Sequence, residues 1–493
     1  MIGGLSKSIS RLALVAAAGV IVGGVAMPSA KAADLGGDCC ADLEERVAEL
    51  EATTARKGNR KVSLTVSGQV NQAIIFWDDG GKSGTYYGLN NNNSTSRFQF
   101  AGDGRVTSKV KVGFLFAFEW GSNTSSGVSQ LDEDGKNLYF GGGANVLAVG
   151  QAAALAASAN GNNQDGVLEV IQANWWIEDS SLGRITVGRQ QTAGSVTTVD
   201  LAGISAVASG SFALLNGSFY LRNTAGALTA LQWSKMTDPA ANQGRQEALR
   251  YDTPAIAGFI GTASIGEAGD TWGVMLRYAG EFSGFRIAGG IGYEKITDKQ
   301  TGLGVDGLYV TAGEPEVKAW GGSLALLHVP SGLFVQGHYQ TVEFANGTNT
   351  DANAAAAILT AGSSYWNHEV ADKAKANHWL VQAGITKNWF GLGNTALYGE
   401  YGKANDFGTR TIAAGRTFAC LPFGCANLTP VAGVTGTELT VWGLGIVQNL
   451  DGAATELYLG YRNFSADLTY TAAGSQFKFQ DIDVVAAGAR IKF

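Results

Sequence analysis

Proline and charge are both scarce in this chain. Its 493 residues include only 7 prolines, and charged residues make up 16%, against about a quarter of a typical globular sequence. Beyond residue 32, no apolar run approaches the roughly 20 residues that a transmembrane helix needs. The sequence therefore excludes a helical membrane protein. A hydrophobic content of 45% also excludes a disordered chain, because disorder requires that charge and proline dilute the apolar residues.

Glycine and aromatic residues are abundant instead. The chain has 69 glycines, 11 tryptophans, 15 tyrosines and 22 phenylalanines. This composition predicts an all-β protein.

The first 32 residues have the pattern of a secretory signal peptide. Lys7 and Arg11 precede an apolar run over residues 12–27, and small residues at 30 and 32 suit a cleavage site after Ala32. Removal of residues 1–32 takes three basic residues and no acid, so the net charge changes from −7 to −10. An acidic mature chain makes nucleic acid an unsuitable partner.

From residue 61 onward, apolar and polar residues alternate with a period of two, as in a strand with one apolar face. In residues 109–120, Lys109 and Lys111 alternate with Val110, Val112 and Phe114. Sixteen such segments can be placed, with lengths that suit tilted membrane strands. They lie at about 62–77, 94–102, 107–120, 167–178, 184–190, 246–253, 258–266, 271–281, 284–294, 317–329, 332–344, 378–389, 394–404, 437–449, 453–466 and 478–493.

The links between these segments alternate between short and long. Every second link is a tight turn, such as residues 102–105 and 330–332, whereas most of the others are long: 121–166, 191–245, 295–316, 345–377 and 405–436. A soluble sandwich has no reason to separate loop lengths in this way, but a bacterial outer-membrane barrel has short periplasmic turns and long outer loops. We therefore predict that residues 60–493 form a 16-stranded antiparallel transmembrane β-barrel.

Four stretches resemble the alphaproteobacterial general porins, which are trimeric outer-membrane proteins. They are residues 33–35 (Ala-Asp-Leu), 277–285 (Arg-Tyr-Ala-Gly-Glu-Phe-Ser-Gly-Phe), 387–395 (Lys-Asn-Trp-Phe-Gly-Leu-Gly-Asn-Thr) and 487–493, which ends in Phe493. The resemblance implies a homotrimer in outer-membrane lipid and lipopolysaccharide. It also implies that the terminal Phe493 is read by the outer-membrane assembly machinery, and that the loop at about 191–245 folds into the lumen as a constriction.

The inward-facing charges of such a barrel determine what passes through it. If apolar positions face lipid or a neighbouring subunit, parity turns a set of basic residues inward: Arg97, Lys109, Lys111, Arg250, Arg277, Arg286, Arg490 and Lys492. The acids of the constriction loop, Asp200 and Asp238, should face this basic wall. We expect Arg97, Lys111 and Arg189 to form one positive arc at the constriction.

Arg189 needs a further assumption. It resembles the arginine that these porins place at the constriction just before the loop, yet strict alternation turns it outward with Val187. A β-bulge at Gly188 would bring it inward, since glycine has no side chain to resist one. The alternative is a surface arginine at a subunit contact.

The sequence has no complete motif for an enzyme active site, a metal site or a cofactor site. The glycine-rich strings at 302–307 and 391–396 lie in a loop and before a strand, whereas a dinucleotide site needs a helix there. The acidic loop at 132–135 lacks the later glutamate of a calcium site. Cys420 and Cys425 have a spacing that can close a small disulfide ring in an oxidising compartment, with free thiols as the alternative.

Residues 33–59 are predicted to form a periplasmic extension. Leu43, Val47 and Leu50 have the spacing of a coiled-coil seam, and disulfides through Cys39 or Cys40 could link neighbouring chains. The mature start at Ala33 resembles barrels whose N-terminal amine is joined to peptidoglycan. The alternative is a disordered periplasmic tail.

The predicted function is therefore passive diffusion of small hydrophilic solutes and ions through a water-filled outer-membrane channel. Two alternatives remain open: a substrate-specific channel, and a structural anchor between the outer membrane and peptidoglycan.

Overall fold

The computed structural model describes most of the barrel. The described residues are 62–121, 123–130, 168–194, 199–208, 210–224, 226, 228–237, 245–266, 269–297, 316–345, 374–407, 434–470 and 476–493. The predicted signal peptide (1–32), the extension (33–59) and the cysteine pair of the last long loop lie outside these residues. No helix among the described residues is long and apolar enough to cross a membrane.

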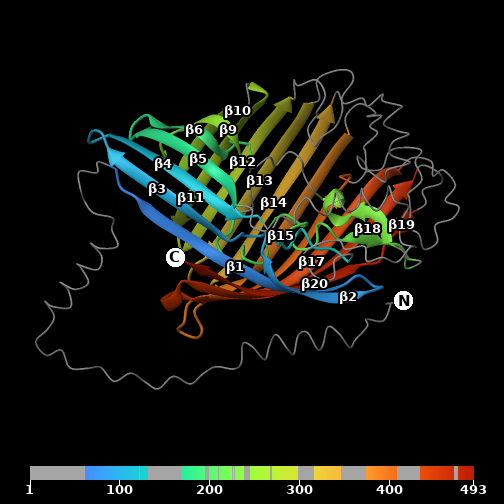
Figure 1. Ribbon diagram of the computed structural model, residues 1–493. Coiled ribbons are helices and arrows are strands. Elements are labelled where there is room, and N and C mark those ends of the chain that lie inside the picture. Colours follow the sequence, from blue (N-terminus) through green and yellow to red (C-terminus); the bar gives the residue numbers. More distant parts are fainter. Residues whose placement is uncertain are drawn as a thin grey trace, which may run out of the picture.

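Antiparallel strands form one closed wall (Figure 1). The first nine wall segments are β1 (Thr65–Asp78), β2 (Ser83–Asn90), β3 (Arg97–Arg105), β4 (Val110–Trp120), β5 (Leu168–Asp179), β6 (Gly183–Gln191), β9 (Arg245–Asp252), β10 (Phe259–Gly266) and β11 (Thr271–Phe282). The others are β12 (Phe285–Thr297), β13 (Glu316–His328), β14 (Leu333–Ala345), β15 (Ala374–Lys387), β16 (Thr395–Asn405), β17 (Val434–Leu450), β18 (Thr455–Tyr470), β19 (Gln476–Lys478) and β20 (Ile482–Lys492).

These 18 segments amount to 16 wall strands. Both β2 and β3 pair with β1, on its later and earlier residues, and so form one interrupted strand. Both β19 and β20 pair with β18 and form another. Pairing of β1 with β20 closes the barrel, and the terminal Phe493 adds hydrogen bonds in both directions with Gly68. The predicted 16-stranded antiparallel barrel is confirmed.

The strand β2 was not predicted from the sequence. The predicted second strand begins at 94, whereas the wall strand starts at Ser83 and is interrupted by residues 91–96, which leave the sheet. The run Asn90-Asn91-Asn92-Asn93 has no apolar alternation, so the period-two pattern could not continue across it.

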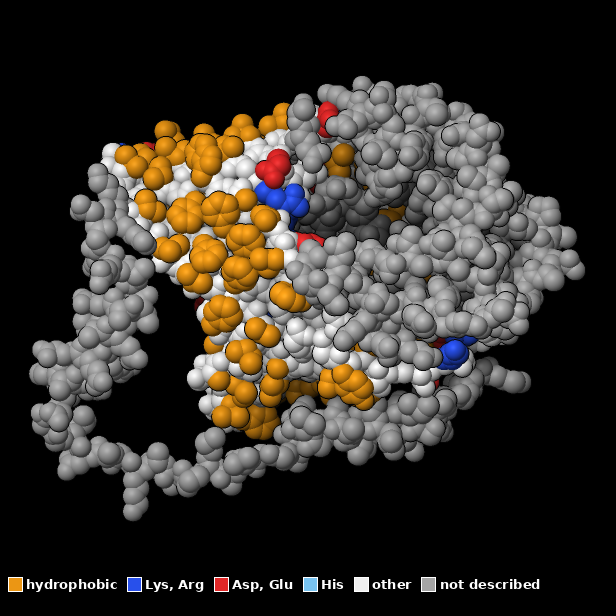
Figure 2. Space-filling view, in the orientation of Figure 1, with side chains coloured by type: hydrophobic (Ala, Val, Ile, Leu, Met, Phe, Trp, Pro, Cys, Tyr) orange, Lys and Arg blue, Asp and Glu red, His pale blue; other side chains and the backbone are white. Residues whose placement is uncertain are grey.

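Alternation separates an apolar outer face from a mixed inner face. In β13, Ala319 and Ala325 are buried, whereas Trp320 and Leu324 are 53% and 60% exposed. Figure 2 shows hydrophobic side chains spread over the visible outside of the wall. An exposed apolar surface of this extent is what a lipid-facing barrel requires.

An aromatic girdle runs around one side of the outer face, with one ring on each strand from β11 to β18. Several neighbouring rings contact each other within it; for example, the Trp379 and Tyr401 centroids are 5.7 Å apart. Such girdles mark the boundary between hydrocarbon and headgroups. Its members are Trp272, Tyr293, Trp320, Tyr339, Trp379, Tyr401, Trp442 and Tyr461.

Two further elements, β7 (Tyr220–Arg222) and β8 (Leu228–Gln232), pair in a separate two-stranded sheet between β6 and β9, followed by the 3-10 turn η1 (Trp233–Met236). A second short turn, η5 (Asp451–Ala453), joins β17 to β18.

Candidate functional site: the barrel lumen

The segment between β6 and β9 lies inside the barrel. We refer to residues 199–208 and 210–224 as the infolded segment. The backbone N–H of Val199 donates to Ser323 Oγ on β13 (2.8 Å), and His378 on β15 lies 3.0 Å from Gly210 O. Both partners are on the inner face, so the segment runs along the lumen side of the wall.

Apolar packing holds the infolded segment close to the wall. Phe212 and Val207 are almost completely buried. A Cβ on Gly402 would lie 2.7 Å from Phe212 Cζ, and one on Gly460 would lie 2.5 Å from Val207 Cγ2. Only glycine permits this close approach.

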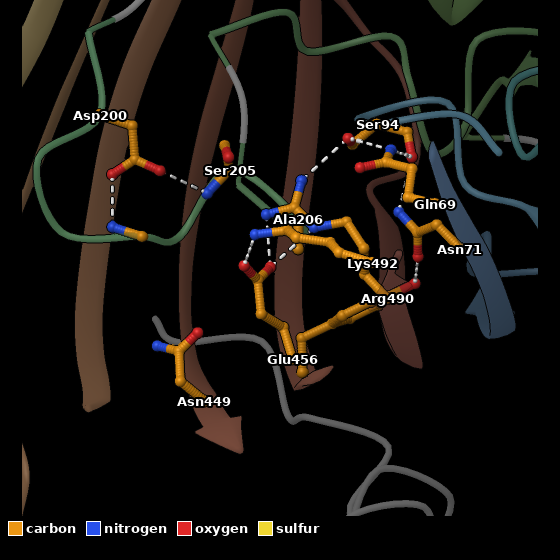
Figure 3. Close-up of polar contacts among 12 residues, drawn as sticks. Gln69, Asn71, Ser94, Asp200, Ser205, Ala206, Asn449, Glu456, Arg490 and Lys492 are labelled. Atoms are coloured by element: carbon orange, nitrogen blue, oxygen red, sulfur yellow. Dashed lines mark hydrogen bonds and ion pairs between the residues drawn. The ribbon is translucent and has the colours of Figure 1, made fainter. Parts of the chain in front are cut away.

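The interruption between β2 and β3 also contacts the infolded segment. Asn91 Nδ2 donates to Ala206 O (2.7 Å) and to Tyr458 Oη (2.8 Å), and Asn91 has no exposed surface. Asn71 Nδ2 and Gln69 Nε2 both donate to Ser94 O, at 2.8 and 3.1 Å, so β1 holds this interruption in place (Figure 3). The asparagine-rich stretch therefore links the infolded segment to β18.

A buried polar network lies beneath the infolded segment. Gln336 Oε1 accepts from Leu201 N (3.3 Å), and Gln336 Nε2 donates to Gln382 Oε1 (3.0 Å). Gln382 Nε2 donates in turn to Glu400 Oε2 (2.9 Å). Glu400 forms a bidentate pair with Arg462, with Nε to Oε1 at 2.5 Å and Nη2 to Oε2 at 2.9 Å.

A second buried ion pair anchors the end of the infolded segment. Arg222 donates through Nε and Nη2 to the two carboxylate oxygens of Asp79, at 3.0 and 2.8 Å. Asp79 lies in the turn between β1 and β2. Burial by itself would raise the pKa of Asp79, but the hydrogen bonds from Arg222 and from the backbone of Lys82 and Gly81 outweigh burial and keep this pKa below its usual value.

Basic residues gather on β3, β9 and β20. Arg97 on β3 is paired across the sheet with Glu119 on β4, and Glu119 Oε1 lies 3.9 Å from Arg245 Nη1. Arg97 is also within electrostatic range of Arg245 and Arg490. We call Arg97, Arg245, Arg490 and Glu119 the arginine face.

Arg490 connects this face to β18. Its Nε donates to Glu456 Oε2 (2.7 Å) and its Nη1 to Ser94 Oγ (2.9 Å), while Lys492 also contacts Glu456. Figure 3 shows Arg490 and Lys492 converging on the Glu456 carboxylate, with Gln69 on the far side of Ser94.

The expected contact between wall arginines and loop acids is wrong for Asp200. Its carboxylate accepts from the backbone N–H groups of Ala202, Gly203 and Ser205 at 2.9, 2.8 and 2.7 Å, and so it stabilises a turn of its own loop (Figure 3). A short polar side chain next to a turn often caps local amides in this way. The acids that pair with wall arginines come from the wall itself.

Arg250 and Arg277 share one such wall acid. Arg250 Nη2 and Arg277 Nη2 lie 2.8 and 2.7 Å from Asp252 Oδ1. All three residues have the inward parity of β9 and β11, and Arg277 is the most exposed of them. Arg250 and Arg277 therefore lie together, as one unit with their own counter-charge.

Lys111 does not join Arg97 in a positive arc. It is paired with Arg105 and with Glu178, whereas Arg97 lies eight positions away from Arg105 on β3. At about 3.3 Å per residue, eight positions correspond to roughly 26 Å along the strand. The two residues therefore lie at different depths.

Arg189 does not turn inward. The pairings of β6 with β5 and with β9 both continue through Gly188 without a register shift. Arg189 thus lies opposite Glu247, on the same face as Leu249, which is 50% exposed. Gly188 does adopt a positive φ of 117°, but the irregularity in register is in β5, where one residue is skipped between Gln172 and Val170.

The remaining predicted site residues lie outside the described residues. They are Asp238 of the constriction loop, Cys420 and Cys425, and Leu43, Val47 and Leu50 of the extension.

Sequence reasoning missed the wall acids and the buried pairs. Glu119, Glu400 and Glu456 have the inward parity of their strands, so the alternation that selected the arginines could also have selected them. The pairing of Glu400 with Arg462 joins residues 62 positions apart, and no local pattern signals it.

A family model described as Gram-negative porin matches residues 13–469. Among solved structures, the chain is similar to the anion-selective porin from Comamonas acidovorans, with 14% identity and a TM-score of 0.50, covering 88% of this chain and all of that one. It is also similar to OmpT of Vibrio cholerae (12% identity, TM-score 0.45, 89% and 99% covered) and to OmpF of Salmonella typhi (13% identity, TM-score 0.45, 88% and 99% covered). No curated protein sequence matches.

Proposed function

Because the chain belongs to the Gram-negative porin family, and is thus an outer-membrane diffusion channel, we propose that it passes small hydrophilic solutes with a weak preference for anions. One observation carries this proposal. The infolded segment contacts inner-face positions on β13, β15 and β18, whereas Arg245 on β9 and Lys492 on β20 keep 34% and 47% of their side chains exposed.

The charges near this face are unequal. Arg97, Arg245, Arg490 and Lys492 carry four positive charges, and Glu119 and Glu456 carry two negative charges. A pore selects by the field at its narrow part, so the excess favours small anions. The paired carboxylates keep the preference weak.

Conductance in a planar bilayer tests the proposal. The purified full-length mature protein should give stable open channels, and a salt gradient should produce a reversal potential of the sign for anion preference. Liposomes with the protein should admit small sugars. A folded protein that does not conduct would overturn the channel proposal, whereas cation preference would overturn only the assignment of the arginine face.

We further propose a homotrimer whose subunits meet on the sector from β20 through β1 to β4. Two features support this. On β20 the outward residues Ala487 and Ala489 are small, and on β3 and β4 the outer rings of Phe98 and Phe118 stack at 5.2 Å. The sector also lacks the aromatic girdle that crosses β11 to β18. Ala487→Arg should abolish cross-linked trimers; unchanged trimers would place the contact elsewhere.

The extension at residues 33–59 is proposed as a trimeric coiled coil and a peptidoglycan tether through Ala33. The heptad spacing and the mature start support this, as does the resemblance to the alphaproteobacterial general porins. Muramidase digestion should release protein carrying a muropeptide on Ala33. A free amine on every molecule would overturn the tether. Cys39→Ser with Cys40→Ser should remove any reducible trimer band.

Three other proposals rest on sequence. Phe493 is proposed as the residue that the outer-membrane assembly machinery reads, and Phe493→Ala should slow assembly.

A disulfide between Cys420 and Cys425 is also proposed, and its reduction should increase the mass of the protein by 2 Da. The chain should show no hydrolase activity, since its sequence offers no paired nucleophile and base.

A further inference from the structure

Two histidines on neighbouring strands face each other on the lumen side of the wall. His338 lies on β14 and His378 on β15, and the two strands are adjacent in Figure 1. His338 is the cross-strand partner of Leu380, two positions from His378, so the two imidazoles are diagonal neighbours, a separation that aromatic side chains can bridge. Their Nε2 atoms lie 2.6 Å apart.

A backbone carbonyl of the infolded segment joins this pair. Gly210 O lies 3.0 Å from His378 Nε2. Two imidazole nitrogens and one carbonyl oxygen, each able to offer a lone pair, therefore converge at one place. A hydrogen on His378 Nε2 would face two acceptors, His338 Nε2 and Gly210 O, and cannot point directly at both. A metal ion at the same place would accept all three lone pairs.

Packing fixes the ring of His378 and leaves His338 accessible. His378 is 4% exposed. The ring centroid of Phe212 in the infolded segment lies 5.1 Å from that of His378, with the rings at 86°, and Phe407 packs edge-on at 6.4 Å. His338 is only partly buried, so the site has an entry path from the lumen, which a metal site requires.

The separation of the donor atoms indicates the class of metal. Imidazole nitrogens bind first-row metals at about 2.0–2.1 Å, so ligands at right angles are about 2.9 Å apart and tetrahedral ligands about 3.3 Å. The separations of 2.6 and 3.0 Å are closer to the right-angled value. Right-angled nitrogen and oxygen donors are typical of Cu²⁺ and Ni²⁺, whereas Mg²⁺ and Ca²⁺ prefer oxygen ligands alone.

A carbonyl donor sets this site apart from a cluster of side chains. In the described part of the chain, no group of three His, Cys, Asp or Glu side chains could hold a metal ion. The third donor here is a backbone oxygen 168 positions from His378 in the sequence. The donor set is therefore complete only when the infolded segment lies against the wall.

We propose that His338 Nε2, His378 Nε2 and Gly210 O bind Cu²⁺ or Ni²⁺ in the lumen. The ion takes the place of the hydrogen between the rings, and each neutral imidazole then carries its hydrogen on Nδ1. His378 Nδ1 has no hydrogen-bond partner among the described residues. Loss of such a partner typically lowers metal affinity about 10–100-fold, so binding should be weaker than in a dedicated metalloprotein.

The bound ion would act on the channel in two ways. It would link β14 and β15 to the infolded segment through Gly210 O. Because all three donors are neutral, it would also add two positive charges to the lumen wall. This site goes beyond the proposed conduction of small solutes, and metal binding can be measured in detergent without a bilayer.

Paired removal of histidines tests the proposal, because the chain has only four. His338→Gln with His378→Gln removes the site and is called the site variant. His328→Gln with His368→Gln leaves the site and is the matched control. His328 Nδ1 lies 2.7 Å from Ser331 Oγ in the turn after β13, and His368 lies outside the described residues. Both variants keep every cysteine, so metal bound by thiols is the same in both.

Calorimetric titration of the full mature protein with NiCl₂ gives the number of bound ions. The wild type and the matched control should each bind one more Ni²⁺ per chain than the site variant. His338→Gln alone should weaken this binding at least about tenfold, the smallest loss that even a second-shell partner of a metal ligand typically causes. Cu²⁺ should bind more tightly than Ni²⁺, and excess Mg²⁺ should not compete.

Reversal potentials in a planar bilayer give a second readout. Ni²⁺ should shift the reversal potential of the wild type and the matched control towards anion preference, and EDTA should reverse the shift. The site variant should conduct without responding to Ni²⁺.

Several results would overturn the proposal: equal Ni²⁺ binding in the site variant and the wild type, an equal loss in the matched control, or effective competition by Mg²⁺. A heat-shift on a denaturing gel checks that each variant is folded. If the site variant does not fold, His338→Gln decides the question, because His338 is partly exposed. Conducting channels that ignore Ni²⁺ would leave the channel proposal intact, and a silent protein that binds Ni²⁺ at this site would leave the metal site intact.

Discussion

The Glu400–Arg462 pair should hold the infolded segment in place. The pair lies beneath the segment, with side-chain exposures of 0% and 2%, and the Arg462 guanidinium also reaches Ser211 O at 3.5 Å. Arg462→Met removes the cation and keeps a side chain of comparable length. Glu400 then retains only the hydrogen bond from Gln382 at 2.9 Å.

The burial of the pair determines the free-energy cost of Arg462→Met. Removing one partner of a buried pair typically costs about 3–5 kcal/mol, because the other charge stays buried without compensation. Moving the infolded segment away from the wall would let water reach Glu400 and recover part of that cost. If displacement of the segment relieves about 3 kcal/mol of this cost, the ratio of seated to displaced segment falls about 100-fold.

Single-channel recording detects such a displacement. Wild-type channels should hold one steady conductance level, whereas Arg462→Met channels should move repeatedly between levels. Glu400→Leu with Arg462→Met should restore a steady level, since replacing both partners by apolar residues is often neutral. Steady Arg462→Met channels in a folded barrel would refute the reasoning, as would a double variant that is as unsteady as the single one.

Charge and pH give further tests. Arg97→Glu should shift the reversal potential towards cation preference several-fold more than Arg189→Glu, because Arg189 lies on the outer face; equal shifts would contradict that placement. The Arg97→Glu shift should shrink in 1 M salt, where the Debye length is about 3 Å. The Asp79–Arg222 anchor should contribute stability above the ordinary pKa of Asp79 and lose it only as pH falls through the lowered folded pKa. Protease resistance of the outer loops should therefore persist in wild type down to about pH 4 and be reduced in Asp79→Asn at neutral pH; equal resistance would disprove the anchor.

The wall of the barrel could be predicted from sequence because lipid imposes a local rule. Every strand must turn apolar side chains outward, so alternation marks strands, and inward positions follow by parity. That rule placed Arg97, Arg250, Arg277 and Arg490 on the inner face, where the structure has them. Residues 91–96 leave the sheet and do not alternate, so β2, which precedes them, was not predicted.

The contacts within the lumen could not be predicted in the same way. Parity gives the face of a side chain but not its depth, so Arg97 and Lys111 were grouped although they lie far apart along the strand. The infolded segment has no period at all, and Asp200 could not be known to cap its own turn. A glycine such as Gly188 can accommodate a bulge. The pairings of β6 with β5 and β9 nevertheless keep their register through Gly188, and the sequence alone does not reveal these pairings.

Burial divides the arginine–carboxylate pairs of the lumen into two kinds. Asp79–Arg222 and Glu400–Arg462 are at most 7% exposed and lie against the infolded segment, and Arg490–Glu456 is at most 9% exposed, whereas Arg245 and Glu119 are 34% and 18% exposed. A segment lying in a water-filled barrel cannot be held by exposed ion pairs, because these contribute about 0–1 kcal/mol. Anchoring therefore requires pairs shielded from water. Solutes, in contrast, respond only to charges that water reaches, so substitutions of Arg245 or Glu119 should change selectivity while leaving the infolded segment seated.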